Sequence, residues 1–325
     1  MQEITIDLTK DPEDRWKHTD PSHIKELADA AEAELHAIYP VWLLRLAEKC
    51  IHALTAYTPT QHVREIEGLA AHAGITPERL LLLNLSYDIT ASGCSLPGML
   101  GCTGALHRDR RGALRLSRAM DWAFPEAIRD YSMLVRFQGP GVSVLTVGFP
   151  GCIGALTGVN AHGVAVALNQ AFVLQMPNWA PSVPWLVRET LIQASSYESA
   201  LKQITTSRAM SSGFYLVTDG TAGALIESTG LIDKLYHCEE LLTVANHFRT
   251  DKEPVVREWG DSHERHATLH SALERGLPAK RALRLKPVEH GYTAHQIVLD
   301  PRKRKIEVRC PNSQEPRWET FYVAS

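Results

Sequence analysis

The sequence predicts an α+β fold, a four-layer αββα sandwich in which two antiparallel sheets are stacked between helical layers. Apolar residues recur at helical spacing over residues 21–90, so we expect a helical N-terminal segment. From residue 103 onward, apolar runs of strand length come in pairs around tight turns, a pattern typical of antiparallel hairpins. Two helical patterns separate the earlier strand pairs from the later ones. This order of elements fits the sandwich.

The N-terminal segment divides into successive helices. Pro40 interrupts the first helical pattern, because proline lacks the amide hydrogen that a helix interior needs. The next pattern ends at Gly74, a residue that favours helix ends. A further helix begins at Thr76–Pro77, since threonine is a good N-cap and proline suits the first turn.

The strands and the later helices follow in a regular order. Glycine-containing turns separate runs of strand-forming residues. We expect hairpins at residues 103–122, 213–228 and 295–310, further strands over residues 131–170 with turns at 139–141 and 160–163, and helices at residues 183–195, 196–205 and 261–276.

Length and charge limit the classes of function. A chain of 325 residues can bury a substantial core in one large domain or two ordinary ones. The net charge is −3, and the short basic run at residues 302–305 is best interpreted as the solvated tip of the last hairpin. Nothing in the charge pattern indicates nucleic acid or a membrane surface. No stretch reaches the roughly 18 to 20 apolar residues that cross a bilayer.

The N-terminus and the cysteines predict a compartment. The first residues are polar and acidic without an apolar core, so we expect no secretory signal. The cysteines lack paired metal-type spacing, and free thiols are the default without export. They are Cys50, Cys94, Cys102, Cys152, Cys238 and Cys310. The expected location is the cytoplasm.

Cys102 stands out by its neighbours. It follows Gly101 directly, and Arg118 and Asp121 lie on the next expected strand. A thiol must lose its proton to act as a nucleophile, so it needs a base or a positive charge nearby. A cysteine at a chain terminus can use its own α-amine as that base. Because Gly101 has no side chain, the Gly101–Cys102 bond before the cysteine would be accessible to cleavage.

Simpler interpretations exist for each of these residues. A single cysteine is most often a small core residue. Arg118 and Asp121 could form a surface ion pair, but residues three apart on a strand point to opposite faces. Cys94, in "ASGCSLPG", is a rival nucleophile without the Gly-Cys-Thr context or the strand-borne arginine and aspartate. The residues around Cys102 therefore favour it over Cys94 as the nucleophile.

Several motifs, in order, resemble one known family. Cys102–Thr103 is followed by Arg118 and Asp121, then by "TGVNAHGVAVALNQ", "PWLVRETLIQASSYESAL", "FYLVTDGTAGALIE", "VANHF" and "DSHERHATL". Before the cysteine stands "EIEGLAAHAGITPERLLLLNLSYDI". Together they resemble the N-terminal-nucleophile (Ntn) cysteine hydrolases of the acid ceramidase, N-acylethanolamine acid amidase and isopenicillin N acyltransferase types. The resemblance runs from about Glu65 to the last hairpin.

The resemblance implies a fold and a maturation step. It implies the αββα Ntn-hydrolase sandwich, with residues 1–101 as a helical, propeptide-like α-segment and residues 102–325 as a β-segment that carries the nucleophile. Autocatalytic scission of Gly101–Cys102 would make Cys102 the new terminus. The two segments would stay associated. The resemblance does not decide the oligomeric state.

The resemblance also implies roles for the first site residues. Cys102 would attack an amide carbonyl and form a thioester acyl-enzyme. Arg118 would favour the thiolate through its fixed positive charge. Asp121 would hold the freed α-ammonium or orient Arg118.

Four more residues complete the expected site. Asn246 would direct its side-chain N–H at the developing oxyanion, with Arg265 adding positive charge behind it. Asn169 is a second candidate for the hydrogen-bond partner of the oxyanion or of the amine. Trp122 would line the acyl pocket.

No metal or cofactor is expected. His263, His266 and His270 fall on one face of the late helix, but the His-Glu-x-x-His pattern of zinc proteases is missing. We interpret them as a solvated helix face.

The predicted function is hydrolysis of a small-molecule N-acyl amine. Acyl transfer to an amine acceptor, or an uncleaved binding protein on the same scaffold, remain the alternatives.

Overall fold

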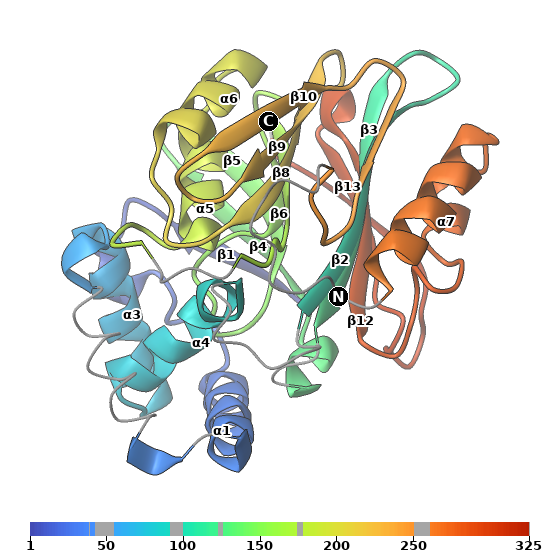
Figure 1. Cartoon of the computed structure of the whole chain (residues 1–325). Helices are drawn as coiled ribbons and strands as arrows, with labels where there is room; N and C mark the ends of the chain where they lie inside the picture. Colours follow the sequence, from blue (N-terminus) through green and yellow to red (C-terminus); the bar gives the residue numbers. More distant parts are fainter. Residues whose placement is uncertain are drawn as a thin grey trace.

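The computed structural model describes residues 1–38, 40–42, 55–91, 100–122, 126–173, 178–249 and 261–324. Two sheets pack face to face, and helices cover their outer faces (Figure 1). The fold is therefore the layered sandwich that the order of elements predicts. Cys94 lies outside the described residues.

The larger sheet has eight strands and carries the central hairpins. In spatial order its strands are β1 (Glu3–Asp7), β4 (Met133–Gly139), β5 (Val142–Gly148), β6 (Thr157–Asn160), β7 (Ala165–Asn169), β8 (Gly213–Thr218), β9 (Gly223–Ser228) and β10 (Asp233–His237). All neighbours pair antiparallel except β1, which runs parallel to β4.

The smaller sheet has six strands and contains Cys102. In spatial order its strands are β11 (Leu241–Val244), β2 (Leu100–Arg108), β3 (Leu114–Trp122), β12 (Thr293–Asp300), β13 (Lys305–Arg309) and β14 (Glu319–Tyr322). Every pair in it is antiparallel. The expected hairpins around residues 111–112 and 301–304 are both formed.

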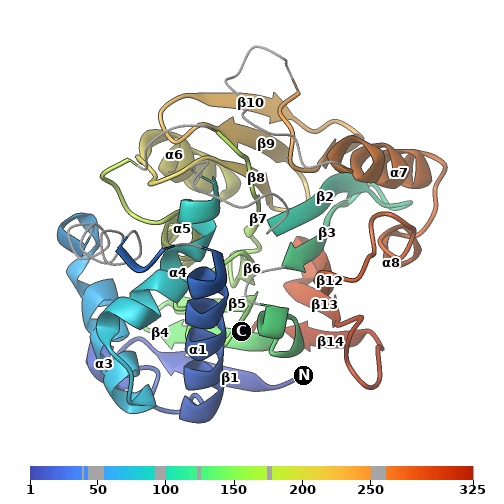
Figure 2. The same ribbon diagram turned by 60° about the horizontal axis from the view of Figure 1, so that its bottom comes forward.

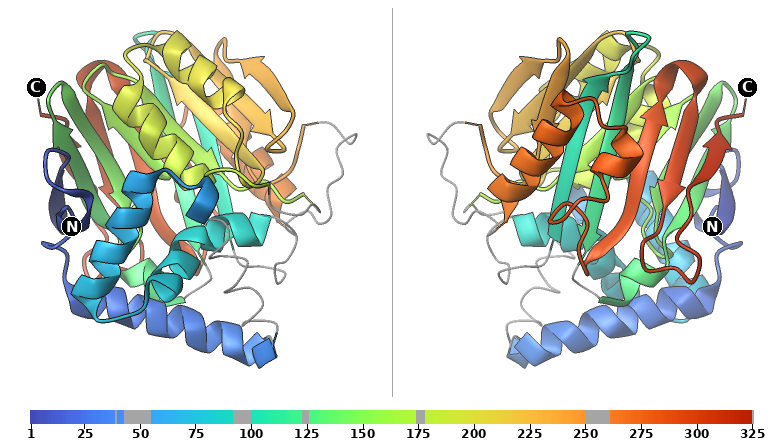
Figure 3. Two further views of the ribbon diagram at one scale, coloured as in Figure 1. Left: turned by 90° about the vertical axis from the view of Figure 1, so that its left-hand side faces the viewer. Right: turned by 90° about the vertical axis from the view of Figure 1, so that its right-hand side faces the viewer.

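Helices cover both sheets. The pair α5 (Val183–Gln193) and α6 (Tyr197–Thr206) lies on the larger sheet, and α7 (Ser262–Glu274) lies on β2 and β11 of the smaller one (Figure 3). Ser196 caps α6 and forms a capping box with Ser199. Serine is one of the residues preferred at a helix N-cap. The remaining short elements are α8 (Ala279–Ala282) and the 3-10 helices Pro12–Asp14, Thr55–Tyr57, Glu126–Asp130 and Pro301–Lys303.

The N-terminal helices gather at one end of the sandwich. They are α1 (Pro21–Ile38), α3 (Thr60–Ala73) and α4 (Pro77–Ala91), and they pack on one another (Figure 2). Gly74 ends α3 in the left-handed conformation that glycine adopts without strain. None of the described helices is long and apolar enough to cross a bilayer.

One buried apolar cluster lies between the sheets, and it joins Leu106 and Leu116 of the smaller sheet to Leu216 of the larger. A Cβ added at Gly104 would stand 2.8 Å from a methyl group of Leu216, so any larger residue there would require that leucine to move. The strand that carries Cys102 packs on β7 and β8. Further apolar clusters lie beneath the helices.

The first strand differs from the expectation. The N-terminal segment is not purely helical, and the larger sheet is mixed, because β1 lies at its edge, parallel to β4. This difference comes from pairing between segments far apart in the chain, which local patterns do not reveal. Cys102 is the third residue of β2 and pairs with Met120 of β3, while the ladder from β2 to β11 begins at Gly104.

Candidate active site

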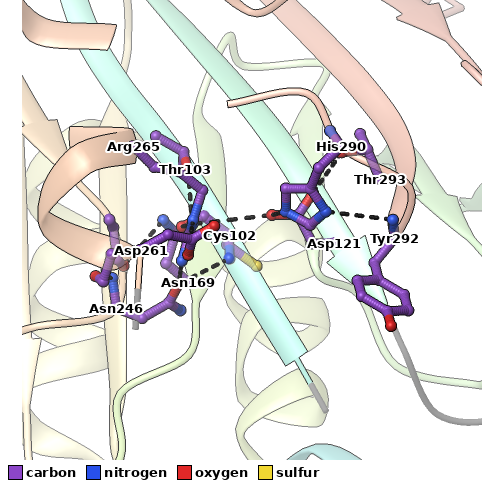
Figure 4. Close-up of polar contacts among 12 residues, drawn as sticks. Cys102, Thr103, Asp121, Asn169, Asn246, Asp261, Arg265, His290, Tyr292 and Thr293 are labelled. Atoms are coloured by element: carbon purple, nitrogen blue, oxygen red, sulfur yellow. Dashed lines mark hydrogen bonds and ion pairs between the residues drawn. The ribbon is translucent and has the colours of Figure 1, made fainter. Parts of the chain in front are cut away.

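The thiol of Cys102 faces the interior between the sheets. The residue is 3 % exposed, and its Sγ accepts a hydrogen bond of 2.9 Å from Nη2 of Arg118. The two residues lie on adjacent strands, since Cys102 pairs with Met120, two residues after Arg118. The alternation of strand side chains therefore puts the cation and the thiol on one face. Figure 4 shows Cys102 among its polar neighbours.

Arg118 reaches across to the other sheet. Its Nη1 donates to Oγ1 of Thr157 at 2.7 Å, and its Nε donates to Oδ1 of Asn169 at 3.2 Å. Nδ2 of Asn169 in turn points at the carbonyl oxygens of Val244 and Ala245, 3.5 and 3.3 Å away. The predicted Asn169 thus belongs to the same network as the thiol.

The backbone of Cys102 is held from the other side. Its nitrogen donates to Oδ1 of Asn246 at 3.0 Å, and its carbonyl oxygen accepts from Nη1 of Arg265 at 2.8 Å. Arg265 also donates to Oδ1 of Asn246 at 2.9 Å and to Oγ1 of Thr103 at 2.8 Å. Asp261, one turn earlier on α7, accepts from its Nε at 2.8 Å. The expected pairing of Asn246 and Arg265 is present.

The side-chain amide of Asn246 is bonded at both ends. Its Nδ2 donates one of its two hydrogens to the carbonyl oxygen of Gln170 at 2.8 Å, which leaves the second hydrogen for another acceptor. Its Oδ1 accepts from the backbone nitrogen of Cys102. The role of Asn246 as an oxyanion donor stays a prediction.

Asp121 lies on the opposite face of β3 from Arg118. Its Oδ1 accepts from Oγ1 of Thr293 at 2.7 Å, while Nε2 of His290 and Nη1 of Arg265 stand 3.1 and 3.8 Å from Oδ2. Burial alone would raise the pKa of Asp121, but His290, Arg265 and Thr293 outweigh it and hold the pKa below its ordinary value. Asp121 does not orient Arg118, because residues three apart on a strand face opposite sides.

Gly101 stands between the two halves of the site. A Cβ at this position would lie 3.3 Å from Oδ2 of Asp121 and 3.5 Å from Nη2 of Arg265. The first distance is tighter than most side-chain carbons show, while the second is an ordinary contact. The glycine before Cys102 therefore leaves room for the carboxylate of Asp121 beside the backbone.

Trp122 lines a small apolar cavity of about 20 Å³. Its ring packs on that of Phe149, with centroids 5.5 Å apart. Leu83 and Tyr87 of α4 and Cys152 line the same cavity. The N-terminal segment thus supplies part of its wall.

The three histidines of α7 are engaged in hydrogen bonds and ring stacking. Oγ1 of Thr243 bonds to Nε2 of His266 at 2.8 Å and to Nδ1 of His270 at 3.1 Å. His263 stacks on His247, with centroids 3.7 Å apart. Burial lowers the pKa of His247 to about 4, helped by the neighbouring histidines and arginines. Within the described ranges, no group of three or more acidic, histidine or cysteine side chains is arranged to hold a metal.

Sequence reasoning missed several members of the site. Thr157, Gln170, His290 and Thr293 all contact predicted residues. Thr157 and Gln170 stand in or beside a quoted motif, but nothing marked their side chains. His290 lies in the loop before β12 and Thr293 is the first residue of that strand, and no motif covers either residue, so no local signal could have found them.

Two stacked sheets between helices, with a cysteine near the start of an inner strand, define the Ntn-hydrolase fold. The solved structure of a Caenorhabditis elegans N-acylethanolamine-hydrolyzing acid amidase ortholog is similar, with a TM-score of 0.51 and 18 % identity over 62 % of this chain and 93 % of that one. The similarity confirms the expected fold.

Sequence relatives point to one group within this class. The rat (Rattus norvegicus) N-acylethanolamine-hydrolyzing acid amidase is 23 % identical over 342 residues, which cover 95 % of this chain and 89 % of that protein. The acid ceramidase of Balaenoptera acutorostrata scammoni is 22 % identical over 248 residues, covering 67 % of this chain and 60 % of that protein. No family model matches the sequence. The chain is a relative of these Ntn cysteine hydrolases, as the motifs around Cys102 predict.

Proposed function

We propose that this protein is an amidase that hydrolyses the carbon–nitrogen bond of an N-acyl amine, with Cys102 as the nucleophile. One observation carries the proposal: Sγ of Cys102 accepts from Arg118, while its backbone nitrogen donates to Asn246. The thiol and the nitrogen of one residue are held by separate groups, which a terminal nucleophile needs. The relatives, an N-acylethanolamine-hydrolyzing amidase and a ceramidase, support the substrate class.

Maturation would free this nitrogen by cutting Gly101–Cys102. Sγ bonds to the carbonyl carbon of Gly101, the bond from that carbon to the nitrogen of Cys102 breaks, and the thiol proton ends on the nitrogen. Water then adds to the thioester, which leaves a carboxylic acid on Gly101 and regenerates the thiol. The products are segments 1–101 and 102–325.

The same groups serve turnover. The new α-amine, held by Asn246, takes the thiol proton as Sγ attacks the substrate carbonyl, and it returns the proton to the leaving amine. Arg118 stabilises the sulfur anion. Asn246 and Asn169 supply side-chain N–H groups to the oxyanion, because Nδ2 of Asn246 keeps a second hydrogen beside the one given to Gln170 and Nδ2 of Asn169 makes only long contacts.

The acyl group would occupy the cavity beside Trp122. Its apolar walls suit a hydrocarbon chain, and Phe149 and Trp122 supply aromatic surface. A volume of about 20 Å³ holds no acyl chain, so the cavity must widen. Part of its wall is α4, which belongs to the segment before the proposed cut, so scission would free the chain end that follows α4.

Replacement of Cys102 tests the proposal. Cys102→Ala is expected to stay one uncut chain and to lose hydrolysis of a panel of N-acylethanolamines and N-acylsphingosines, while its circular dichroism matches the parent. Cys310→Ala is the matched control, because this remote thiol is partly buried and burial raises its pKa to about 11. Intact mass and product release are the measurements. Equal activity in Cys102→Ala and the parent would refute the proposal.

A further inference from the structure

His290 and Asp121 form a close pair beside the bond that maturation cuts (Figure 4). Nε2 of His290 lies 3.1 Å from Oδ2 of Asp121. Within the part of the chain that the structure describes, neither atom has a well-aligned hydrogen bond, although both are buried. A buried polar atom without a hydrogen bond lowers the stability of the fold, so its presence calls for an explanation.

The turn at residues 290–293 fixes the imidazole. Nδ1 of His290 accepts from the backbone nitrogen of Tyr292 at 3.2 Å, which leaves Nε2 as the protonated atom. The backbone nitrogen of His290 donates to Oγ1 of Thr293 at 3.0 Å, and that hydroxyl donates to Oδ1 of Asp121 at 2.7 Å. One short turn therefore presents two donors to the two carboxylate oxygens.

Contacts outside the turn hold it against β3. The backbone nitrogen of Trp122 donates to the carbonyl oxygen of Tyr292 at 2.8 Å. Arg129 donates to the carbonyl oxygen of Gly291 at 2.6 Å, and its guanidinium lies 5.5 Å from the centre of the Tyr292 ring. The position of His290 is thus set by the end of the strand that carries Asp121.

The pair lies at the cleavage point rather than at the thiol. Oδ2 of Asp121 would be 3.3 Å from a Cβ on Gly101, and Gly101 pairs with Asp121 across the strands. Cleavage turns the neighbouring amide nitrogen into an amine that gains a proton. An ionised carboxylate on this side of the strand stabilises that positive charge.

We propose that His290 is a positioning residue for scission of Gly101–Cys102, which acts by holding the carboxylate of Asp121 turned toward Gly101. The inference rests on the proposed function. The side chain of His290 is 20 % exposed and that of Asp121 is 1 % exposed, so the carboxylate is buried beside the imidazole. Without the imidazole, Oδ1 of Asp121 keeps Thr293, but Oδ2 loses the polar atom nearest to it.

The test measures the cleavage rate of the full chain during cell-free synthesis, followed by intact mass. His290→Phe keeps a ring without a donor and is expected to slow cleavage about 10- to 100-fold, the range for leaving a buried charged group without its polar neighbour. His290→Gln restores an N–H donor and should recover most of the rate. His162→Phe, in the turn between β6 and β7, is the control and should cleave like the parent.

A double-mutant cycle separates positioning from a structural role. If His290 acts through Asp121, adding His290→Phe to Asp121→Asn should slow cleavage no further. Additive losses, or a His290→Gln variant as slow as His290→Phe, would overturn the inference. Unchanged cleavage in His290→Phe with a cleaving parent would refute this inference alone. A parent that never cleaves would refute the proposed maturation, and this inference with it.

Discussion

Arg118 is a buried cation whose hydrogen-bond acceptors within the described ranges are all uncharged side chains. The residue is 1 % exposed, and its acceptors are Sγ of Cys102, Oγ1 of Thr157 and Oδ1 of Asn169. A buried charge without an opposite charge lowers stability. The thiolate of Cys102 would supply the missing anion. The proposed role of Arg118 at the thiol explains why the protein keeps a buried charge that lowers stability.

Replacing this guanidinium separates the two effects. Arg118→Met keeps the length of the side chain and removes the charge, so we expect equal or higher stability toward urea. The rate constant for hydrolysis should fall on the order of 100-fold, as for the loss of one electrostatic group in an active site. Urea unfolding and product release measure the two quantities. A variant with lower stability and an unchanged rate would contradict this explanation.

Among the elements, α3 and α5 are joined by a buried carboxylate. Glu65 of α3 accepts two hydrogen bonds from Arg188 of α5, at 2.6 and 2.8 Å. Arg15 and the indole of Trp16 donate to the same carboxylate at 2.7 and 2.8 Å. Since Arg188 lies after the cleavage site and the other three lie before it, this cluster ties the two segments together.

Removing the carboxylate should loosen both helices. Glu65→Gln leaves two buried guanidinium groups without their anion, and we expect a loss of about 3–5 kcal/mol in the free energy of unfolding. Glu13→Gln, which breaks the exposed pair with Arg64, is the control and should scarcely change the urea midpoint. Similar midpoints for Glu65→Gln and the parent would show that the cluster does not hold the helices.

The same carboxylate predicts a pH dependence. Burial would raise the pKa of Glu65, but Arg188, Trp16 and Arg15 outweigh it and lower the pKa from 4.5 to about 2. Its contribution to stability is therefore complete above pH 4.5 and is lost as the pH falls toward 2. In Glu65→Gln this part of the acid sensitivity should be missing. Urea midpoints at pH 6, 4 and 3 measure the difference.

At the scale of the whole molecule, the segment before the proposed cleavage site contributes a strand to the larger sheet. β1 pairs in parallel with β4 over Glu3–Asp7, and the amino group of Met1 lies 3.0 Å from Glu319 near the other terminus (Figure 3). Separating residues 1–101 from the rest would break this pairing and expose the apolar faces of α1, α3 and α4. Cleavage should therefore not release the segment.

Size-exclusion chromatography of the cleaved protein tests this expectation. Segments 1–101 and 102–325 should elute together in native buffer and separate only in denaturant. Truncation of residues 1–8, which removes β1, is expected to lower the denaturant concentration at which they separate, because the ladder to β4 is lost. Separate elution without denaturant would contradict the proposed role of β1.

Local patterns determined much of this protein. Hairpins, the α5–α6 pair and α7 were predictable because apolar periodicity and turn residues act over a few neighbours. The approach of Arg118 to Cys102 followed from two strands joined by a short turn. The resemblance to the Ntn cysteine hydrolases also implied that Asn169, Asn246 and Arg265 belong to one site.

Only the tertiary structure decided how these residues work. It directed Oδ1 of Asn246 to the nitrogen of Cys102, turned Asp121 away from Arg118, and brought His290 to the cleavage point. It also placed β1 in the larger sheet. Each outcome depends on contacts between segments far apart in the chain, and on the face of a strand that packing buries. Such contacts form through the shape and charge of the assembled layers, which no short stretch of sequence encodes.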